Sequence, residues 1–180
     1  AAAIHTAGAL VLQLEIPLPA VVRAVEVAAE NHVPVILNPA PAAAVPDSLL
    51  AMVDTLTPNE WEAQSLTGVA VEDDASAHRA AQQLLRKGVR TVIITMGGRG
   101  AWLETHDRAE RIPAFPVQAL DTTAAGDVFT AALAVALMEK KPLSQAVYFA
   151  SAAAAISVTR LGAQPSAPER KEVEKWLAER

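Results

Sequence analysis

The chain has 180 residues, of which 52% are hydrophobic and 19% are charged, and this balance is typical of a globular protein rather than a disordered one. Its net charge of −5 argues against a nucleic-acid-binding protein, which usually presents a basic face. The absence of cysteine excludes disulfides, thiolate zinc sites and thiol catalysis.

The start of the sequence has no initiator Met and no basic region followed by an apolar core, so a secretory signal is not expected. We interpret the chain as a partial sequence from a cytoplasmic protein. Residues 142–159 carry no charge, and in this respect the stretch is similar to a membrane-spanning helix. Because Ala and Ser dominate this stretch and gain little from transfer into lipid, it predicts a buried helix instead.

Short β-branched runs alternate with longer segments that carry helix signals. In chain order we expect a strand at 9–14, a helix at 17–31, strands at 33–37 and 54–56, helices at 59–66 and 74–87, strands at 91–95, 101–104 and 111–117, and helices at 125–139, 143–159 and 168–179. The segment 101–104 is expected to pair antiparallel with 91–95, and 111–117 is a weaker edge segment with two prolines. This alternation predicts an α/β fold with a mostly parallel sheet, in one domain over 1–180.

The segment 121–127, DTTAAGD, is the strongest candidate for chemistry. Small residues lead into a predicted helix whose first turn carries Asp127. Free amides and the helix dipole form an anion site there, and an adjacent acid can accept a proton from an attacking hydroxyl. Taken alone, the pattern fits an ordinary acidic helix start equally well.

A glycine-rich segment follows the clearest strand, with Gly97, Gly98 and Gly100 around Arg99. The backbone could approach a phosphate here and Arg99 could neutralise its charge, although a tight hairpin turn explains the same residues. The chain contains neither GxxxxGK[ST] nor GxGxxG, and the missing glycine fingerprint disfavours an NAD-binding Rossmann domain.

Two further pairs of polar residues are candidates. Asn59 and Glu62 lie three apart at a helix start and could hold magnesium-bound water or orient phosphates, but an N-cap with a capping carboxylate is the simpler reading. Gln13 and Glu15 lie at the end of the first strand, where open α/β sheets bind ligands, or they are simply solvated.

Taken together and in this order, the segments resemble the ribokinase-like (PfkB) family of carbohydrate kinases. The resemblance is carried by DTTAAGDVFTAALA (121–134), TPNEWEAQSLTG (57–68), TVIITMGGRGAW (91–102), NPAPA (38–42) and AAAAISVTRLGAQPSAP (152–168). It implies a ribokinase-like three-layer α/β/α sandwich and an ATP-dependent kinase for the 5-hydroxyl of ribose. Fructose or 2-keto-3-deoxygluconate as the sugar, and a non-catalytic nucleotide-binding fragment, remain alternatives.

The resemblance also implies roles for individual positions. Asp127 is the base that deprotonates the sugar, and Glu15 is a second sugar contact. The backbone amides of the anion hole are those of Ala124, Ala125, Gly126 and Asp127. The implied ATP contacts are Asn59, Thr95, Met96, Gly97, Gly98, Arg99, Gly100, Gly126 and Ser151.

Mg²⁺ with ATP and K⁺ as an activator are the implied cofactors. Glu62 influences magnesium indirectly, and the implied ligands of the monovalent cation are Asp121, Thr123, Ser157, Arg160, Gly162 and Ser166, several through backbone carbonyls. The chain resembles the C-terminal portion of the family, without its Gly-Gly sugar motif and β lid. The expected partners are ATP and a small sugar, without nucleic acid or membrane, and the parent protein is expected to be a homodimer through the lid.

Overall fold

The computed structural model describes residues 2–180, and they form two compact units. Unit 1 runs to Met96 and includes Trp102–Arg111, whereas unit 2 consists of Gly97–Ala101 and Ile112–Arg180. That residues 1–180 act as a single domain remains a prediction.

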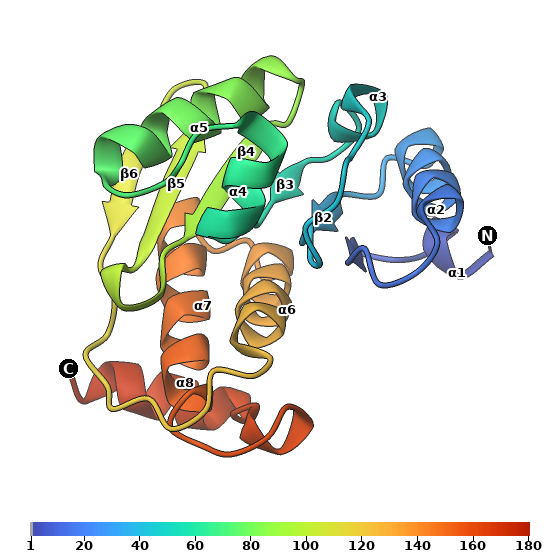
Figure 1. Ribbon diagram of the computed structural model, residues 1–180. Coiled ribbons are helices and arrows are strands. Elements are labelled where there is room, and N and C mark those ends of the chain that lie inside the picture. Colours follow the sequence, from blue (N-terminus) through green and yellow to red (C-terminus); the bar gives the residue numbers. More distant parts are fainter. Residues whose placement is uncertain (1) are drawn as a thin grey trace. The chain divides into compact units, whose positions relative to one another are not determined.

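Unit 1 is built on a six-stranded sheet in which the strands follow one another in chain order (Figure 1). The strands are β1 (Leu10–Leu12), β2 (Val35–Leu37), β3 (Thr55–Leu56), β4 (Thr91–Thr95), β5 (Ala101–Thr105) and β6 (Ala109–Ile112). The first four pair in parallel. The connections on either side of β5 are too short for a crossover, so β5 and β6 run antiparallel to their predecessors.

The helices of unit 1 are α1 (Ala2–His5), α2 (Leu18–Glu30), α3 (Asp47–Leu50), α4 (Glu60–Thr67) and α5 (Asp74–Arg86). Right-handed crossovers between strands in sequential order place α2, α4 and α5 on the same face of the sheet. Local sequence sets their ends. For example, Asp73 and Ser76 form a capping box at the start of α5, and Gly88 follows its end with a φ of 100°.

The core of unit 1 lies between this helical layer and the sheet. Val25 of α2, Leu84 of α5 and Leu37 of β2 are all fully buried in one apolar cluster. The neighbouring strand residues Ile36 and Ile93 are buried as well. Burial of successive residues along a strand is the pattern typical of parallel strands.

Unit 2 is helical. Its α-helices are α6 (Ala125–Met138), α7 (Leu143–Ser157) and α8 (Arg170–Ala178), and its short 3-10 helices are η1 (Gly97–Arg99) and η2 (Gln164–Ser166). The long helices α6 and α7 lie along one another. Ala146, Ala150 and Ala152 on α7 are fully buried, and their small side chains allow close packing around this helix. The C-terminal helix α8 packs on α7 and is tied by ion pairs from Arg160 to Glu172 and from Arg170 to Glu139.

The strand at 91–95 is confirmed to the residue, and the helices expected to start near Asn59 and near Ala125 are confirmed as well. The predicted edge segment at 111–117 is wrong over most of its length, because β6 spans Ala109–Ile112 and Pro113 ends it. The short helix α3 was not expected. It begins after Pro46, whose fixed φ suits a helix start.

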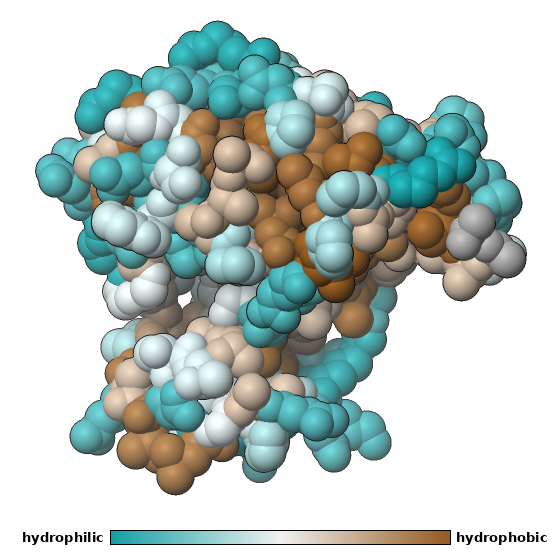
Figure 2. Space-filling model, turned by 45° about the vertical axis from the view of Figure 1, so that its right-hand side comes forward, coloured by the Kyte–Doolittle hydropathy of each residue, from teal (hydrophilic) through white to brown (hydrophobic). Residues whose placement is uncertain are grey.

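The predicted buried helix at 142–159 is confirmed as α7, and none of the helices within residues 2–180 has the length and apolar character needed to cross a bilayer. The surface drawn in Figure 2 mixes apolar and polar side chains. The large apolar residues exposed among those described are Val11, Ile16, Trp61, Leu120, Val135, Met138, Tyr148 and Leu161. Of these, Trp61 on α4 is exposed by 73%.

Candidate active site

The start of α6 is a helix terminus without a side-chain cap among the described residues. Its N-cap is Ala124, which has a left-handed backbone with a φ of 60° and no side-chain oxygen that could accept from the first-turn amides. Gly126 is exposed at this turn and adds no bulk. The Ala125 N–H donates to the Thr122 carbonyl at 3.2 Å, and the remainder of this first turn, with the positive end of the helix dipole, favours an anion.

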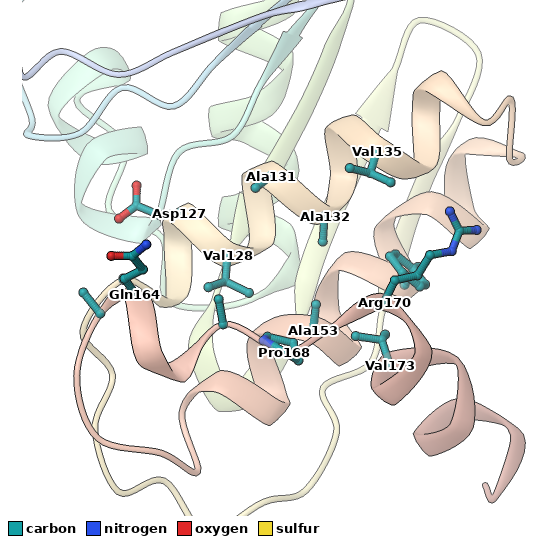
Figure 3. A pocket seen from close by; sticks show the side chains of 14 residues that line it. Asp127, Val128, Ala131, Ala132, Val135, Ala153, Gln164, Pro168, Arg170 and Val173 are labelled. Atoms are coloured by element: carbon teal, nitrogen blue, oxygen red, sulfur yellow. The ribbon is translucent and has the colours of Figure 1, made fainter.

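Asp127 lies in the first turn of α6, and its exposed side chain lines a cavity of about 500 Å³ within unit 2 (Figure 3). The walls come from α6, α7, α8 and the turn at 163–168. Among the described residues lining it, the polar side chains are those of Asp127, Gln164 and Arg170. The carboxylate is thus accessible at the cavity rather than turned into the protein interior. A proton-accepting role requires this accessibility.

Asp121 fastens the loop before α6 to the turn after α7. One carboxylate oxygen accepts from the Thr123 N–H at 2.9 Å, and the other accepts from the Gly162 N–H, also at 2.9 Å. Hydrogen bonds from the Thr123 side chain, then from the Gly162 and Thr123 backbone, hold the pKa of Asp121 below its ordinary value. Asp121 therefore keeps a negative charge between the two loops.

The other positions expected to bind a monovalent cation flank this junction. The Ser157 hydroxyl donates to the Ala154 carbonyl at 2.8 Å, and the Ser166 hydroxyl donates to the Ala163 carbonyl at 2.7 Å, so both buried serines are already bonded. The Arg160 side chain pairs with Glu172, which leaves its backbone carbonyl as the group that could face a cation. Oxygen ligands of this kind, a carboxylate and backbone carbonyls, are those that hard cations prefer.

The glycine-rich segment forms a turn at the start of unit 2. Gly97 and Gly100 have φ values of 52° and 92°, which favour glycine, and a Cβ on Gly100 would lie 2.1 Å from the Ile112 carbonyl oxygen. A Cβ on Gly98, by contrast, would meet no described atom within 4 Å. The hairpin-turn reading is therefore correct for Gly100, whereas Gly97 and Gly98 remain open to an approaching ligand. Ser151, the remaining predicted nucleotide contact in unit 2, is half-buried on α7.

In unit 1 the predicted pair Asn59 and Glu62 forms a capping box at the start of α4. The Asn59 side chain accepts from the Glu62 N–H at 2.8 Å, while Glu62 accepts from the Asn59 backbone N–H at 2.8 Å and from its amide nitrogen at 3.0 Å. Burial raises the pKa of Glu62, and the hydrogen bond from the Asn59 backbone partly opposes this shift. Since both Glu62 oxygens are engaged, any influence on a metal would be indirect.

The strand β4 brings Thr95 beside this helix start. Asn59 and Thr95 form a parallel β-bridge, and the Thr95 N–H donates to the Pro58 carbonyl at 2.9 Å. Met96 is buried, so a contact with a ligand would have to involve its backbone. Glu15 is exposed in the bend after β1.

Sequence reasoning did not single out two polar groups that the structure makes prominent. Gln164 shares the cavity of unit 2 with Asp127. In the sequence, the segment around Gln164 indicates only ligands for a monovalent cation. In unit 1 the buried carboxylate of Glu104 accepts from His78, Gln82 and Trp102. No sequence signal predicted that cluster, because its members come from an α-helix and a strand that fold together only in three dimensions.

The protein has an α/β fold. At its candidate site, an uncapped helix start can bind an anion, and the neighbouring carboxylate can accept the proton of a hydroxyl. Residues 1–170 match the pfkB family carbohydrate kinases, and the chain belongs to this family.

Among curated proteins, the chain is 47% identical over 176 residues to a ribokinase from Haemophilus influenzae, covering 98% of this chain and 58% of that protein. Among solved structures it is similar to a ribokinase from Thermotoga maritima, with a TM-score of 0.89 and 40% identity, over 98% of this chain and 59% of the other. The structure of Arabidopsis thaliana ribokinase complexed with ribose and ATP gives a TM-score of 0.92 at 37% identity, over 97% of this chain and 57% of the other.

These structural matches confirm the predicted ribokinase-like α/β sandwich. The chain spans less than three-fifths of the length of the relatives named above.

Proposed function

We propose that the protein transfers the γ-phosphoryl group of ATP to the 5-hydroxyl of ribose, as an ATP-dependent carbohydrate kinase. The observation that carries this proposal is the start of α6, where uncapped amides and the exposed carboxylate of Asp127 lie together at a cavity. Membership of the pfkB family and the similarity to ribokinases support the reaction class and the sugar.

In this mechanism Asp127 accepts the proton of the sugar hydroxyl as its oxygen attacks the γ-phosphorus. The bond to the β-phosphate oxygen breaks and ADP leaves. The backbone amides of Ala124, Ala125, Gly126 and Asp127 form the anion hole and stabilise the charge on the migrating phosphoryl group. Asn59 and the backbone of the segment from Thr95 to Gly100, with Arg99 and Ser151, hold ATP, and Glu15 contacts the sugar.

Two cations complete the proposal. Mg²⁺ accompanies ATP and neutralises its phosphates, and Glu62 acts on it through Asn59 because its own oxygens are engaged. K⁺ would be held at the junction between the two loops that Asp121 joins, with Thr123, Ser157, Arg160, Gly162 and Ser166 supplying oxygens, and its charge would support the anion hole. Rates that are equal in potassium and in a large organic cation would contradict the potassium site.

The test of the base is Asp127→Asn in the full-length gene product, with ribose and ATP. We expect kcat to fall about 100- to 10,000-fold, the range for loss of a general base, while the Kd for ATP stays nearly unchanged. The matched control is Asp107→Asn, in the exposed turn between β5 and β6, which should retain full turnover. Full turnover in Asp127→Asn would remove Asp127 from the mechanism.

A sugar panel tests the substrate, since a fructose or 2-keto-3-deoxygluconate kinase would use the same base and anion hole. We expect the highest kcat/KM for ribose. The 180-residue chain alone is expected to bind ATP without transferring its phosphoryl group, and calorimetry with a parallel assay for ADP would test this. For the whole protein we propose a homodimer and a cytoplasmic location.

A further inference from the structure

The cavity of unit 2 has polar groups at its two ends and apolar walls between them. Figure 3 shows Asp127 and Gln164 at one end, while Arg170 lies at the other. The Arg170 guanidinium is bound by Glu139 at 2.8 Å and by Glu174 at 2.7 Å. Because Arg170 is committed to these carboxylates, Gln164 is the polar cavity residue placed to act beside Asp127.

The turn that carries Gln164 is fastened at both ends. Before it, the Gly162 N–H is bound by Asp121, and after it, Ser166 is fully buried and bonded to the Ala163 carbonyl. Asp121 also binds the Thr123 N–H in the loop that leads into α6. One carboxylate therefore links the backbone that carries Gln164 to the backbone that leads to Asp127, so the spacing of the two is set by the fold.

The Gln164 side chain is exposed at the cavity, so packing does not account for its position. A carboxamide has two N–H donors, and a hydrogen bond to one oxygen of a carboxylate fixes the direction in which the other oxygen points. The remaining lining is Ala, Val, Phe and Pro, whose side chains cannot donate a hydrogen bond.

We propose that Gln164 is the positioning residue of the base: its amide donates an N–H to one oxygen of Asp127 and so leaves the other directed at the sugar hydroxyl. This inference rests on the proposed function and adds to it a residue to which no role in the reaction has been given. A hydrogen bond to the charged form of a carboxylate also favours that form over the protonated one.

The test is a kinetic comparison of Gln164→Ala and Gln164→Glu with the unaltered full-length gene product over a range of pH. We expect kcat of Gln164→Ala to fall roughly ten- to a hundredfold, the effect of losing one hydrogen bond to a charged group. The acid limb of kcat/KM should move to higher pH, and it should move further in Gln164→Glu because a second carboxylate opposes ionisation of the first. The KM for ATP should stay the same.

The matched control is Gln145→Ala, an exposed glutamine of α7 outside the cavity, which should leave kcat and the pH profile unchanged. An unmoved acid limb in both Gln164 variants would overturn the inference, even if kcat fell, because a merely structural role would lower kcat alone. Asp127→Asn separates the two proposals. If it is inactive while Gln164→Ala behaves normally, the positioning role fails and the kinase mechanism stands.

Discussion

Asn59 and Glu62 show how a residue can serve the fold and a ligand site together. Their capping box satisfies the amides at the start of α4, and the β-bridge to Thr95 places Asn59 beside the end of β4. A role of this pair in capping α4 is therefore compatible with a role in binding ATP. The pair has to be tested with a variant that separates lost stability from lost binding.

We predict that Asn59→Ala lowers the free energy of unfolding by about 1 kcal/mol, as loss of an N-cap does, and also raises the KM for ATP. Asp73→Ala provides the matched control, because Asp73 caps α5 in the same way. It should lower stability by a similar amount and leave the KM for ATP unchanged. Urea unfolding and steady-state kinetics measure the two effects, and an equal rise in KM in both variants would contradict a direct role for Asn59.

Asp121 gives a prediction with a defined dependence on pH. Because hydrogen bonds to its carboxylate lower its pKa in the folded state, its contribution to stability is present above the pKa of the unfolded chain, about 3.9. That contribution is lost as the pH falls through the lower folded pKa. The difference in stability between the unaltered protein and Asp121→Asn should thus be largest near neutral pH and should shrink in acid.

Urea unfolding at several pH values measures this difference. Thr123→Val is a useful companion, because it removes the hydroxyl and keeps the backbone N–H that donates to Asp121. It should show a smaller effect in the same direction. A difference between Asp121→Asn and the unaltered protein that grew as the solution became more acidic would contradict the assignment.

At the scale of elements, the glycine-rich turn depends on Gly100. An added Cβ would lie 2.1 Å from the Ile112 carbonyl oxygen and 2.7 Å from the Ala114 nitrogen, and the φ of 92° disfavours any side chain. We predict that Gly100→Ala lowers the free energy of unfolding by about 2 kcal/mol or more. Gly98→Ala should cost much less, because its Cβ would meet no described atom within 4 Å. Equal losses in the two variants, measured by thermal or urea unfolding, would contradict this account.

The elements that the sequence predicted well are those with strong local signals. The β-branched run TVIIT is β4 to the residue, and Asn59 caps α4 as its spacing to Glu62 indicated. The misses occurred where local signals conflict or are weak. The weak edge segment expected at 111–117 ran across Pro113, although β6 ends at Ile112, and α3 is only four residues long. Short helices depend on tertiary packing rather than on propensity.

The candidate site follows the same division. The helix start at Ala124 and the position of Asp127 in its first turn follow from a run of small residues ending in an acid. The pairing of Asp121 with Gly162 joins residues 41 positions apart, so no local pattern could reveal it. Gln164 escaped notice for a similar reason, because Asp127, which lines the same cavity, is distant from it in the sequence.

At the scale of the whole molecule, the two edges of the sheet differ in their protection. The edge strand β6 has the sequence AERI, whose charged residues discourage pairing with a second chain. The opposite edge strand β1 is LVL and has no charge, and Val11 at its centre is 37% exposed. An apolar edge with unpaired backbone groups invites association between copies.

We predict that the 180-residue chain associates as its concentration rises, and that Val11→Lys reduces this association. A charge on β1 raises the cost of burying that edge against another chain. Glu110→Lys, which exchanges one charge for another on β6, is the control and should leave association unchanged. Sedimentation velocity at several concentrations distinguishes these outcomes, and equal association of Val11→Lys and the unaltered chain would exclude β1 as the contact.

The exposure of Trp61 has a practical consequence for experiments in solution. The other two tryptophans are engaged: Trp102 donates to Glu104, and Trp176 meets Phe115 in an edge contact and carries Arg180 over its ring. Trp61 lies two positions beyond Asn59 and is 73% exposed, so a water-soluble quencher such as iodide should reach its indole first. The protein therefore carries a native fluorophore beside Asn59, and its quenching should report on occupancy there without an added label.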